Sequence, residues 1–215
     1  AMGIPAVLSV LDVTSKITDG EELLVDGFKG KVITNPSADE LEQYKQKHIE
    51  YLKERESLNE YFNKPTVTKS GVVKKVYGNI GKAEDAQNVV QNGGEGIGLF
   101  RTEFLFMDRE YEPTENEQFE AYSTVAKALD GKEVIIRTLD IGGDKAIDYL
   151  NIEKEENPFL GFRAVRYCLE NKELYKTQIR AILRAAQFGN VKVMIPLVTT
   201  VDEVRAVKSL IDECC

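Results

Sequence analysis

The stretch GLFRTEFLF at residues 98–106 is apolar, and Arg101 lies in its middle. A second apolar run, VIIRTLDIGGDK at residues 134–145, contains Arg137 in the same setting. In both places a run with the composition of a buried strand is followed by Arg-Thr and then by an acidic residue or a loop. The spacing of such strands predicts a fold, and the repeated arginine predicts a site at their ends.

Outward from these two runs, the chain alternates between strands and helices from residue 66 onwards. Strands are predicted at residues 72–80, 96–100, 134–138 and 191–198, and helices at residues 83–92, 113–129, 159–170, 172–188 and from 200 onwards. Asn157 and Pro158 are of the types that cap a helix and occupy its first turn, which places the start of one helix near residue 159. Apolar strands that alternate with helices indicate a parallel sheet.

Four such βα units suit two architectures, namely half of a (β/α)8 barrel or a doubly wound sheet. The last helix reaches Cys215 without a glycine, asparagine or proline that would end it. We therefore expect an α/β fold in which residues 66–215 form the first four βα units of a partial TIM barrel.

The residues before this region have a different character. Residues 1–36 show a strand, a turn and a second strand, and they are too few for a core of their own. We expect them to be either an addition at the edge of a sheet or the C-terminal end of another domain. In residues 37–65, Ser37 and Glu40 form a capping box ahead of a helix with a narrow apolar seam, which we interpret as a linker helix.

Composition and charge exclude several classes of function. The 215 residues carry a net charge of −8, which does not favour binding to nucleic acid or to an anionic membrane. No apolar run approaches the ~20 residues of a membrane span, and the opening AMGIPAV lacks the basic segment of a signal peptide. The cysteines are Cys168, Cys214 and Cys215, an odd number that does not suit a disulfide framework, so we predict a cytoplasmic protein.

Arg101 and Arg137 lie at the C-terminal ends of neighbouring predicted strands, where parallel α/β folds build their sites. We expect their guanidinium groups to converge on one anion, because arginine presents a planar fork of donors to phosphate or carboxylate oxygens. Two arginines together clamp a transferring phosphoryl group and stabilise its charge. The threonine after each arginine is expected to add a hydroxyl donor, and Lys145 and Arg163 are further candidate cations.

The alternative for each arginine is a structural role, in an ion pair with a local acid such as Glu103 or Asp140. The repetition of Arg-Thr at two neighbouring strand ends favours the anion site. Other motifs are weaker. GGEGIG at residues 93–98 precedes a strand instead of following one, so it indicates a turn and not a phosphate-binding loop. His48 is the only histidine and is expected to be a partly exposed packing residue of the linker helix, without a catalytic role.

Four segments together carry a resemblance to a known family. GGEGIGLFRTEFLFMDRE, PTENEQ, VIIRTLDIGGDK and EENPFLGFRAVR resemble the phosphoenolpyruvate-utilising enzymes. Within that family, FRTEFLFMDR with PTENEQF is more similar to the enzyme I branch of bacterial sugar phosphotransferase systems than to pyruvate phosphate dikinase or phosphoenolpyruvate synthase. The resemblance extends over essentially the whole chain.

The resemblance implies a (β/α)8 barrel that binds phosphoenolpyruvate and Mg²⁺ at its C-terminal mouth. It implies transfer of the phosphoryl group to a histidine on a swivelling domain, whose C-terminal end matches residues 1–36. From there the group passes to a small histidine-containing phosphocarrier protein that serves sugar uptake, and the whole enzyme is expected to be a homodimer.

Residue by residue, Arg101 and Arg137 match the two arginines that hold the phosphoryl group in the family, and Arg163 and Lys145 match positions near the site. The acceptor histidine, the magnesium-binding acids and the catalytic cysteine of the family match nothing in this chain. We therefore expect an internal fragment that has no catalytic or metal-binding residue of its own and is inactive alone. The alternatives are a dikinase-like or synthase-like enzyme, or a noncatalytic anion-binding half-barrel.

Overall fold

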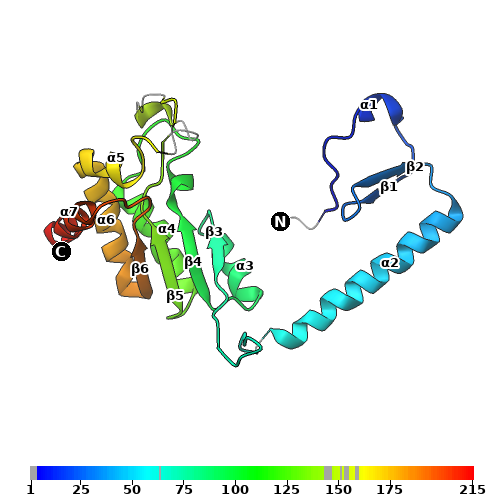
Figure 1. Ribbon diagram of the computed structural model, residues 1–215, viewed down its shortest axis with the longest axis horizontal. Helices are drawn as coiled ribbons and strands as arrows, with labels where there is room; N and C mark the ends of the chain where they lie inside the picture. The colour runs from blue at the N-terminus through cyan, green and yellow to red at the C-terminus, as the bar shows by residue number, and fades with distance from the viewer. Residues whose placement is uncertain (1–3, 63, 143–146, 151, 153–154, 158–159) are drawn as a thin grey trace. The chain divides into compact units, whose positions relative to one another are not determined.

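The computed structural model describes residues 4–62, 64–142, 147–150, 152, 155–157 and 160–215 (Figure 1). The chain divides into two compact units, Ala1–Phe62 and Asn63–Cys215. Within the described residues, no helix combines the length and the apolar character needed to cross a membrane.

The first unit is built on a hairpin followed by a long helix. Strands β1 (Leu23–Asp26) and β2 (Lys31–Thr34) pair antiparallel, after a short helix α1 (Val13–Lys16). The Asp26 carboxylate closes the turn by accepting hydrogen bonds from the backbone N–H groups of Phe28 and Lys29, at 3.0 and 2.9 Å. This side-chain-to-backbone pattern is what makes aspartate a turn residue, and the predicted strand, turn and strand are confirmed.

Helix α2 (Ala38–Ser57) begins at the predicted capping box. Ser37 accepts a hydrogen bond from the Glu40 N–H, and the Glu40 carboxylate accepts one in return from the Ser37 N–H. The helix gives way to a 3-10 turn, η1 (Leu58–Tyr61). No described residue of α2 is buried, and His48 is exposed on it. The narrow seam therefore covers little surface within this unit.

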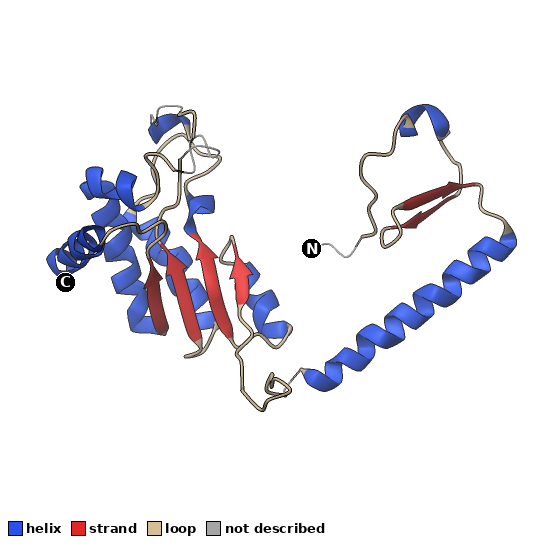
Figure 2. Ribbon diagram, in the orientation of Figure 1, coloured by secondary structure: helices blue, strands red, loops and turns tan. Residues whose placement is uncertain are grey.

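The second unit is a four-stranded parallel sheet in the order β3-β4-β5-β6 (Figure 2). Its strands are β3 (Gly78–Ile80), β4 (Gly96–Arg101), β5 (Glu133–Arg137) and β6 (Asn190–Met194). The helices are α3 (Asp85–Gln91), α4 (Glu115–Ala128), α5 (Val165–Glu170), α6 (Lys172–Ala185) and α7 (Val201–Cys214), with short turns η2 (Thr102–Leu105), η3 (Asp148–Leu150) and η4 (Ala186–Phe188). The predicted parallel sheet with alternating helices is confirmed.

Three element boundaries differ most from the prediction. Strand β6 ends at Met194 and not at residue 198. Strand β3 begins at Gly78 and not at residue 72, and the N–H of Val76 donates to the side chain of Glu95 instead of to a neighbouring strand. Helix α5 begins at Val165 and not near residue 159, because the N–H of Ala164 is held by the Ile141 carbonyl at 3.2 Å and Ala164 has a φ of 52°. The expected first-turn residue, Pro158, lies outside the described residues.

The sheet packs its helices against one face. Ile97, Phe100, Val134 and Ile136 of the strands are fully buried in a core with residues of α4 and α6. Along β5, buried and half-buried side chains alternate, as the period of a strand requires. The residues that alternate with the core, including Ile135, therefore lie on the opposite face. We call the core between the sheet and these helices the helix-side core. Because side chains alternate along a strand, a residue next to one in this core lies on the opposite face of the sheet.

Helix α4 starts at a capping box that also reaches the loop after β4. The Glu117 carboxylate accepts hydrogen bonds from the N–H and hydroxyl of Thr114, at 2.7 and 2.8 Å, and an ion pair from Arg109. Arg109 in turn donates to the Leu105 carbonyl oxygen in that loop at 3.2 Å. The Arg109 contact, followed by the Thr114 backbone, lowers the pKa of Glu117 from 4.5 to about 2.

This shift predicts a stability that depends on pH. Glu117→Gln should lower the free energy of unfolding at pH 7 by about 1 kcal/mol, a modest value because the side chain is half exposed and screened by solvent. Since the folded pKa is depressed, the difference from wild type should be complete above pH 4.5 and shrink as the pH falls towards 2. Urea unfolding from pH 7 to 3 measures it. The exposed Glu120→Gln is the control, and an equal, pH-independent loss in both variants contradicts the prediction.

Candidate functional site

Arg101 and Arg137 are register partners at the C-terminal ends of β4 and β5. Each follows a side chain of the helix-side core, Phe100 in one case and Ile136 in the other. Both arginines consequently lie on the opposite face of the sheet. The structure thus brings the two predicted arginines together on neighbouring strands and on the same face.

Arg137 lies in a chain of ion pairs. Its Nη2 donates to Oε1 of Glu103 at 2.8 Å, and its Nη1 lies 3.0 Å from Oδ2 of Asp140. The other oxygen of Asp140 accepts a hydrogen bond from Nη2 of Arg163 at 2.9 Å. The Glu103 side chain is 0% exposed, and those of Arg163, Asp140 and Arg137 are 6%, 10% and 16% exposed. Arg137 therefore forms the ion pairs with Glu103 and Asp140 that a structural role requires. The predicted cation Arg163 belongs to the same cluster of charged side chains.

A glycine in the loop after β5 permits this approach of Arg163. Gly142 has a φ of +142°, which side chains rarely adopt. A Cβ atom there would collide with Cβ of Arg163 and would lie 3.1 Å from its Cα. The first glycine of the IGGDK motif is thus required for the packing of Arg163 beside Asp140. Lys145 of the same motif lies outside the described residues.

Arg101 is held by different contacts. Its guanidinium group lies over the ring of Phe104, 4.8 Å from the ring centroid, in a cation–π arrangement. It also reaches the end of β3, where a Cβ added to Gly81 would lie 3.5 Å from Nη2. Among the described residues no carboxylate forms an ion pair with Arg101, and its buried Nε finds no hydrogen-bond partner there. Arg101 therefore has donors left for a ligand.

The two threonines do not face the site, contrary to prediction. Thr102 and Thr138 are both fully buried. The Thr102 hydroxyl donates to the carbonyl oxygen of Arg137 at 2.8 Å, and the Thr138 hydroxyl lies 3.4 Å from that of Tyr175. Their side chains point into the helix-side layer because they come one residue after the arginines. They hold the strand ends in place instead of donating to a ligand.

A buried glutamine that the sequence analysis did not single out completes this support. Gln178 of α6 is fully buried, and its Nε2 donates to the hydroxyls of Thr102 and Tyr122, each at 3.1 Å. Its Oε1 accepts from the N–H of Leu139 at 2.9 Å. One amide therefore links the ends of β4 and β5 to α4 and α6. In the sequence, Gln178 could have been noticed as a polar residue on the apolar face of the amphipathic helix α6.

The charges of the cluster favour an anion. The guanidinium groups of Arg101, Arg137 and Arg163 outnumber the carboxylates of Glu103 and Asp140, so these five side chains carry one net positive charge. Partly buried, this charge is screened less than one on the surface. The remaining donors of Arg101 suit the oxygens of a phosphate or carboxylate. The arrangement can bind an anionic group and stabilise charge that develops on it.

The remaining candidates lie away from this cluster. Cys168 is fully buried in the core beside Leu139, and burial raises the pKa of its thiol, which makes it unreactive. Cys214 and Cys215 lie at the end of α7, and His48 lies in the first unit. Among the described residues, no group of three or more His, Cys, Asp or Glu side chains is arranged to hold a metal ion.

Comparison with known proteins identifies the class to which this site belongs. Residues 55–215 match the family described as PEP-utilising enzyme, PEP-binding domain. Since the match extends over most of the chain, the chain belongs to the phosphoenolpyruvate-utilising enzyme family, and the resemblance seen in its motifs is confirmed.

Individual members of the family are similar to this chain over nearly its whole length. The chain is 47% identical over 213 residues to the phosphoenolpyruvate-protein phosphotransferases of Bacillus subtilis (strain 168) and Geobacillus stearothermophilus. It is 45% identical to that of Staphylococcus aureus (strain MSSA476). These matches cover 99% of the chain and 37% of each relative, so the chain spans little more than a third of the length of the curated relatives it matches.

Proposed function

We propose that these residues belong to a phosphoenolpyruvate–protein phosphotransferase and form part of its phosphoenolpyruvate site. The full-length protein would move the phosphoryl group of phosphoenolpyruvate to its own histidine and then to a histidine-containing phosphocarrier protein, for sugar uptake. The observation that carries this proposal is the register pairing of Arg101 with Arg137, on one face of the sheet, inside the segment matched to a phosphoenolpyruvate-binding domain.

The fold supports a partial (β/α)8 barrel. The sheet is all parallel, its helices pack against one face, and the arginines lie at the C-terminal strand ends on the other face. A barrel places its interior and its site in this relation, whereas a doubly wound sheet is covered by helices on both faces. We assign residues 66–215 to the first half of the barrel, 37–65 to a linker helix and 1–36 to the end of a swivelling phosphohistidine domain.

Each cation of the site would have its own role. Arg101 uses its remaining donors to bind oxygens of the phosphoryl group directly. Arg137, held by two carboxylates, keeps a fixed orientation and adds its charge to the same group. Arg163 lies one carboxylate further away and balances the charge of Asp140. We propose Lys145 as a further cation of the site, on the strength of its position in the IGGDK motif.

We propose Mg²⁺ as the cofactor of the full-length protein, where it would neutralise charge on the bound phosphate and carboxylate. The described residues do not fit such an ion, because the carboxylates nearest to the arginines, Glu103 and Asp140, already accept ion pairs from Arg137. On the strength of the family resemblance, we propose that its ligands lie outside this chain. We further propose a cytoplasmic homodimer.

Labelled phosphoenolpyruvate tests the proposal. The full-length protein should acquire acid-labile label from the phosphoryl group and pass it to a histidine-containing phosphocarrier protein. The isolated 215-residue chain should stay unlabelled, because its only histidine is His48, in the first unit. Label on the isolated chain contradicts the assignment of the acceptor histidine to another part of the protein. A full-length protein that never takes label overturns the proposed function and favours a noncatalytic anion-binding module.

A further inference from the structure

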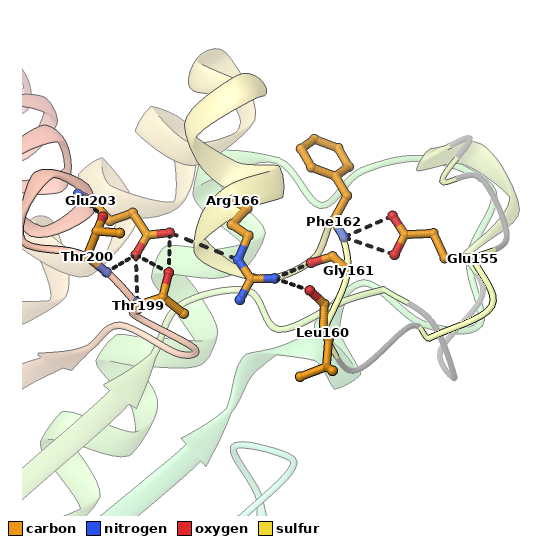
Figure 3. A network of polar contacts seen from close by, with 8 residues as sticks. All are labelled: Glu155, Leu160, Gly161, Phe162, Arg166, Thr199, Thr200 and Glu203. Carbon is orange, nitrogen blue, oxygen red and sulfur yellow. Dashed lines mark hydrogen bonds and ion pairs between the residues drawn. The ribbon is translucent and has the colours of Figure 1, made fainter.

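The loop that carries Arg163 is clamped by a second arginine, Arg166, at the start of α5 (Figure 3). Nη1 of Arg166 donates to the carbonyl oxygen of Leu160 at 2.8 Å and also to that of Gly161. These carbonyls immediately precede Phe162 and Arg163. A charged guanidinium that binds two successive carbonyls fixes the path of the backbone at this point.

A carboxylate clamps the same loop from another direction. Both oxygens of Glu155 accept the N–H of Phe162, at 3.0 and 3.1 Å (Figure 3). The carboxylate occupies the space where a side chain at position 161 would begin, so any larger residue there would displace the Glu155 carboxylate. The loop is thereby held through its carbonyls by one charged side chain and through its N–H by another. It leads directly to the backbone of Arg163.

Arg166 also forms an ion pair with the first turn of α7. Its Nε lies 4.0 Å from Oε1 of Glu203, the third residue of α7. The Glu203 carboxylate accepts hydrogen bonds from the N–H groups of Thr199 and Thr200, at 2.6 and 2.8 Å, and these bonds lower its pKa. Figure 3 shows Glu203 between the two threonines and Arg166. The helix cap of α7 therefore keeps an ionised carboxylate in a fixed place beside Arg166.

We propose that Arg166 is a positioning residue of the phosphoenolpyruvate site, an inference that rests on the proposed function. It fixes the 160–163 loop against the cap of α7, and the loop places Arg163 on Asp140, which binds Arg137. These contacts connect the cap of α7 with the end of β5. Arg166 touches no atom of the substrate and acts only through Arg163.

A double-mutant cycle in the full-length protein tests this route. Arg166→Ala should lower kcat/KM for phosphoenolpyruvate by about tenfold to a hundredfold, since a displacement of ~1 Å at a reacting group costs that much. In an Arg163→Ala background, the same change should lower kcat/KM by less than about twofold, because the group it positions is already gone. Arg166→Lys should recover only part of the loss, since an ammonium group cannot reproduce the fork of donors.

The control is Arg205→Gln, which removes an arginine of α7 whose ion pair with Asp202 is exposed, and it should leave kcat/KM unchanged. A merely structural Arg166 predicts additive effects, with a lower melting temperature and an equal loss in both backgrounds. Additive effects in an active wild-type protein overturn the inference alone. An inactive wild-type protein overturns the proposed function and the inference with it.

Discussion

Replacing Arg101 with alanine should slow phosphoryl transfer from phosphoenolpyruvate in the full-length protein by about a hundredfold to a thousandfold. The reason is the state of its guanidinium group. Among the described residues it forms no ion pair, its Nε has no hydrogen-bond partner, and it lies over the Phe104 ring at the C-terminal strand ends. Its charge is available to the transferring group, so about 3–4 kcal/mol of transition-state stabilisation should disappear with it.

Stability should change little in the same variant, because no buried carboxylate among the described residues loses an ion pair with Arg101. Single-turnover transfer and thermal unfolding, measured on the same preparations, separate the two effects. Arg101→Lys should remain well below wild type, since a point charge cannot make the forked contact. A variant that unfolds several degrees earlier yet transfers at the normal rate would show that Arg101 is structural, and the proposed role would be wrong.

The elements that could be predicted from the sequence are those decided by nearby residues. The capping boxes at Ser37, Thr114 and Thr200 each mark a helix start, because both partners lie within three residues of each other. The ends of β4 and β5 were predictable from apolar runs, and the register of a parallel pair then placed Arg101 beside Arg137. Local chemistry was sufficient for the core of the site.

The elements that could not be predicted depend on distant contacts. Residues 72–77 have the composition of a strand, but the backbone of residues 72–74 pairs with residues 66–68, and the N–H of Val76 bonds to the side chain of Glu95. The start of α5 is delayed by the bond from Ala164 to Ile141, 23 residues away in the chain. Likewise Gln178 reaches Thr102 across 76 residues. No pattern within a short window of sequence contains these pairings.

Arg137 should respond to substitution in a different way from Arg101. Glu103 is 0% exposed and lies 34 residues away in sequence, so its ion pair with Arg137 forms only when β4 and β5 are assembled. Removing one partner of a buried ion pair leaves the desolvated partner less compensated, which costs ~3–5 kcal/mol. Arg137→Ala removes partners from both Glu103 and Asp140. We therefore expect a stability loss of about 3 kcal/mol or more, together with the loss of transfer.

Urea unfolding of the 215-residue chain measures this loss without any need for activity. The matched control is Arg205→Ala, which also deletes an arginine from an ion pair, but one whose side chains are 75% and 87% exposed. Its cost should stay below ~0.5 kcal/mol, because solvent replaces the lost contact. If Arg137→Ala unfolds with the free energy of Arg205→Ala, the carboxylates of Glu103 and Asp140 do not need Arg137. The guanidinium would then serve the ligand alone, as proposed for Arg101. A loss of about 3 kcal/mol in Arg137→Ala, with none in Arg101→Ala, instead shows that only one arginine of the pair also stabilises the fold.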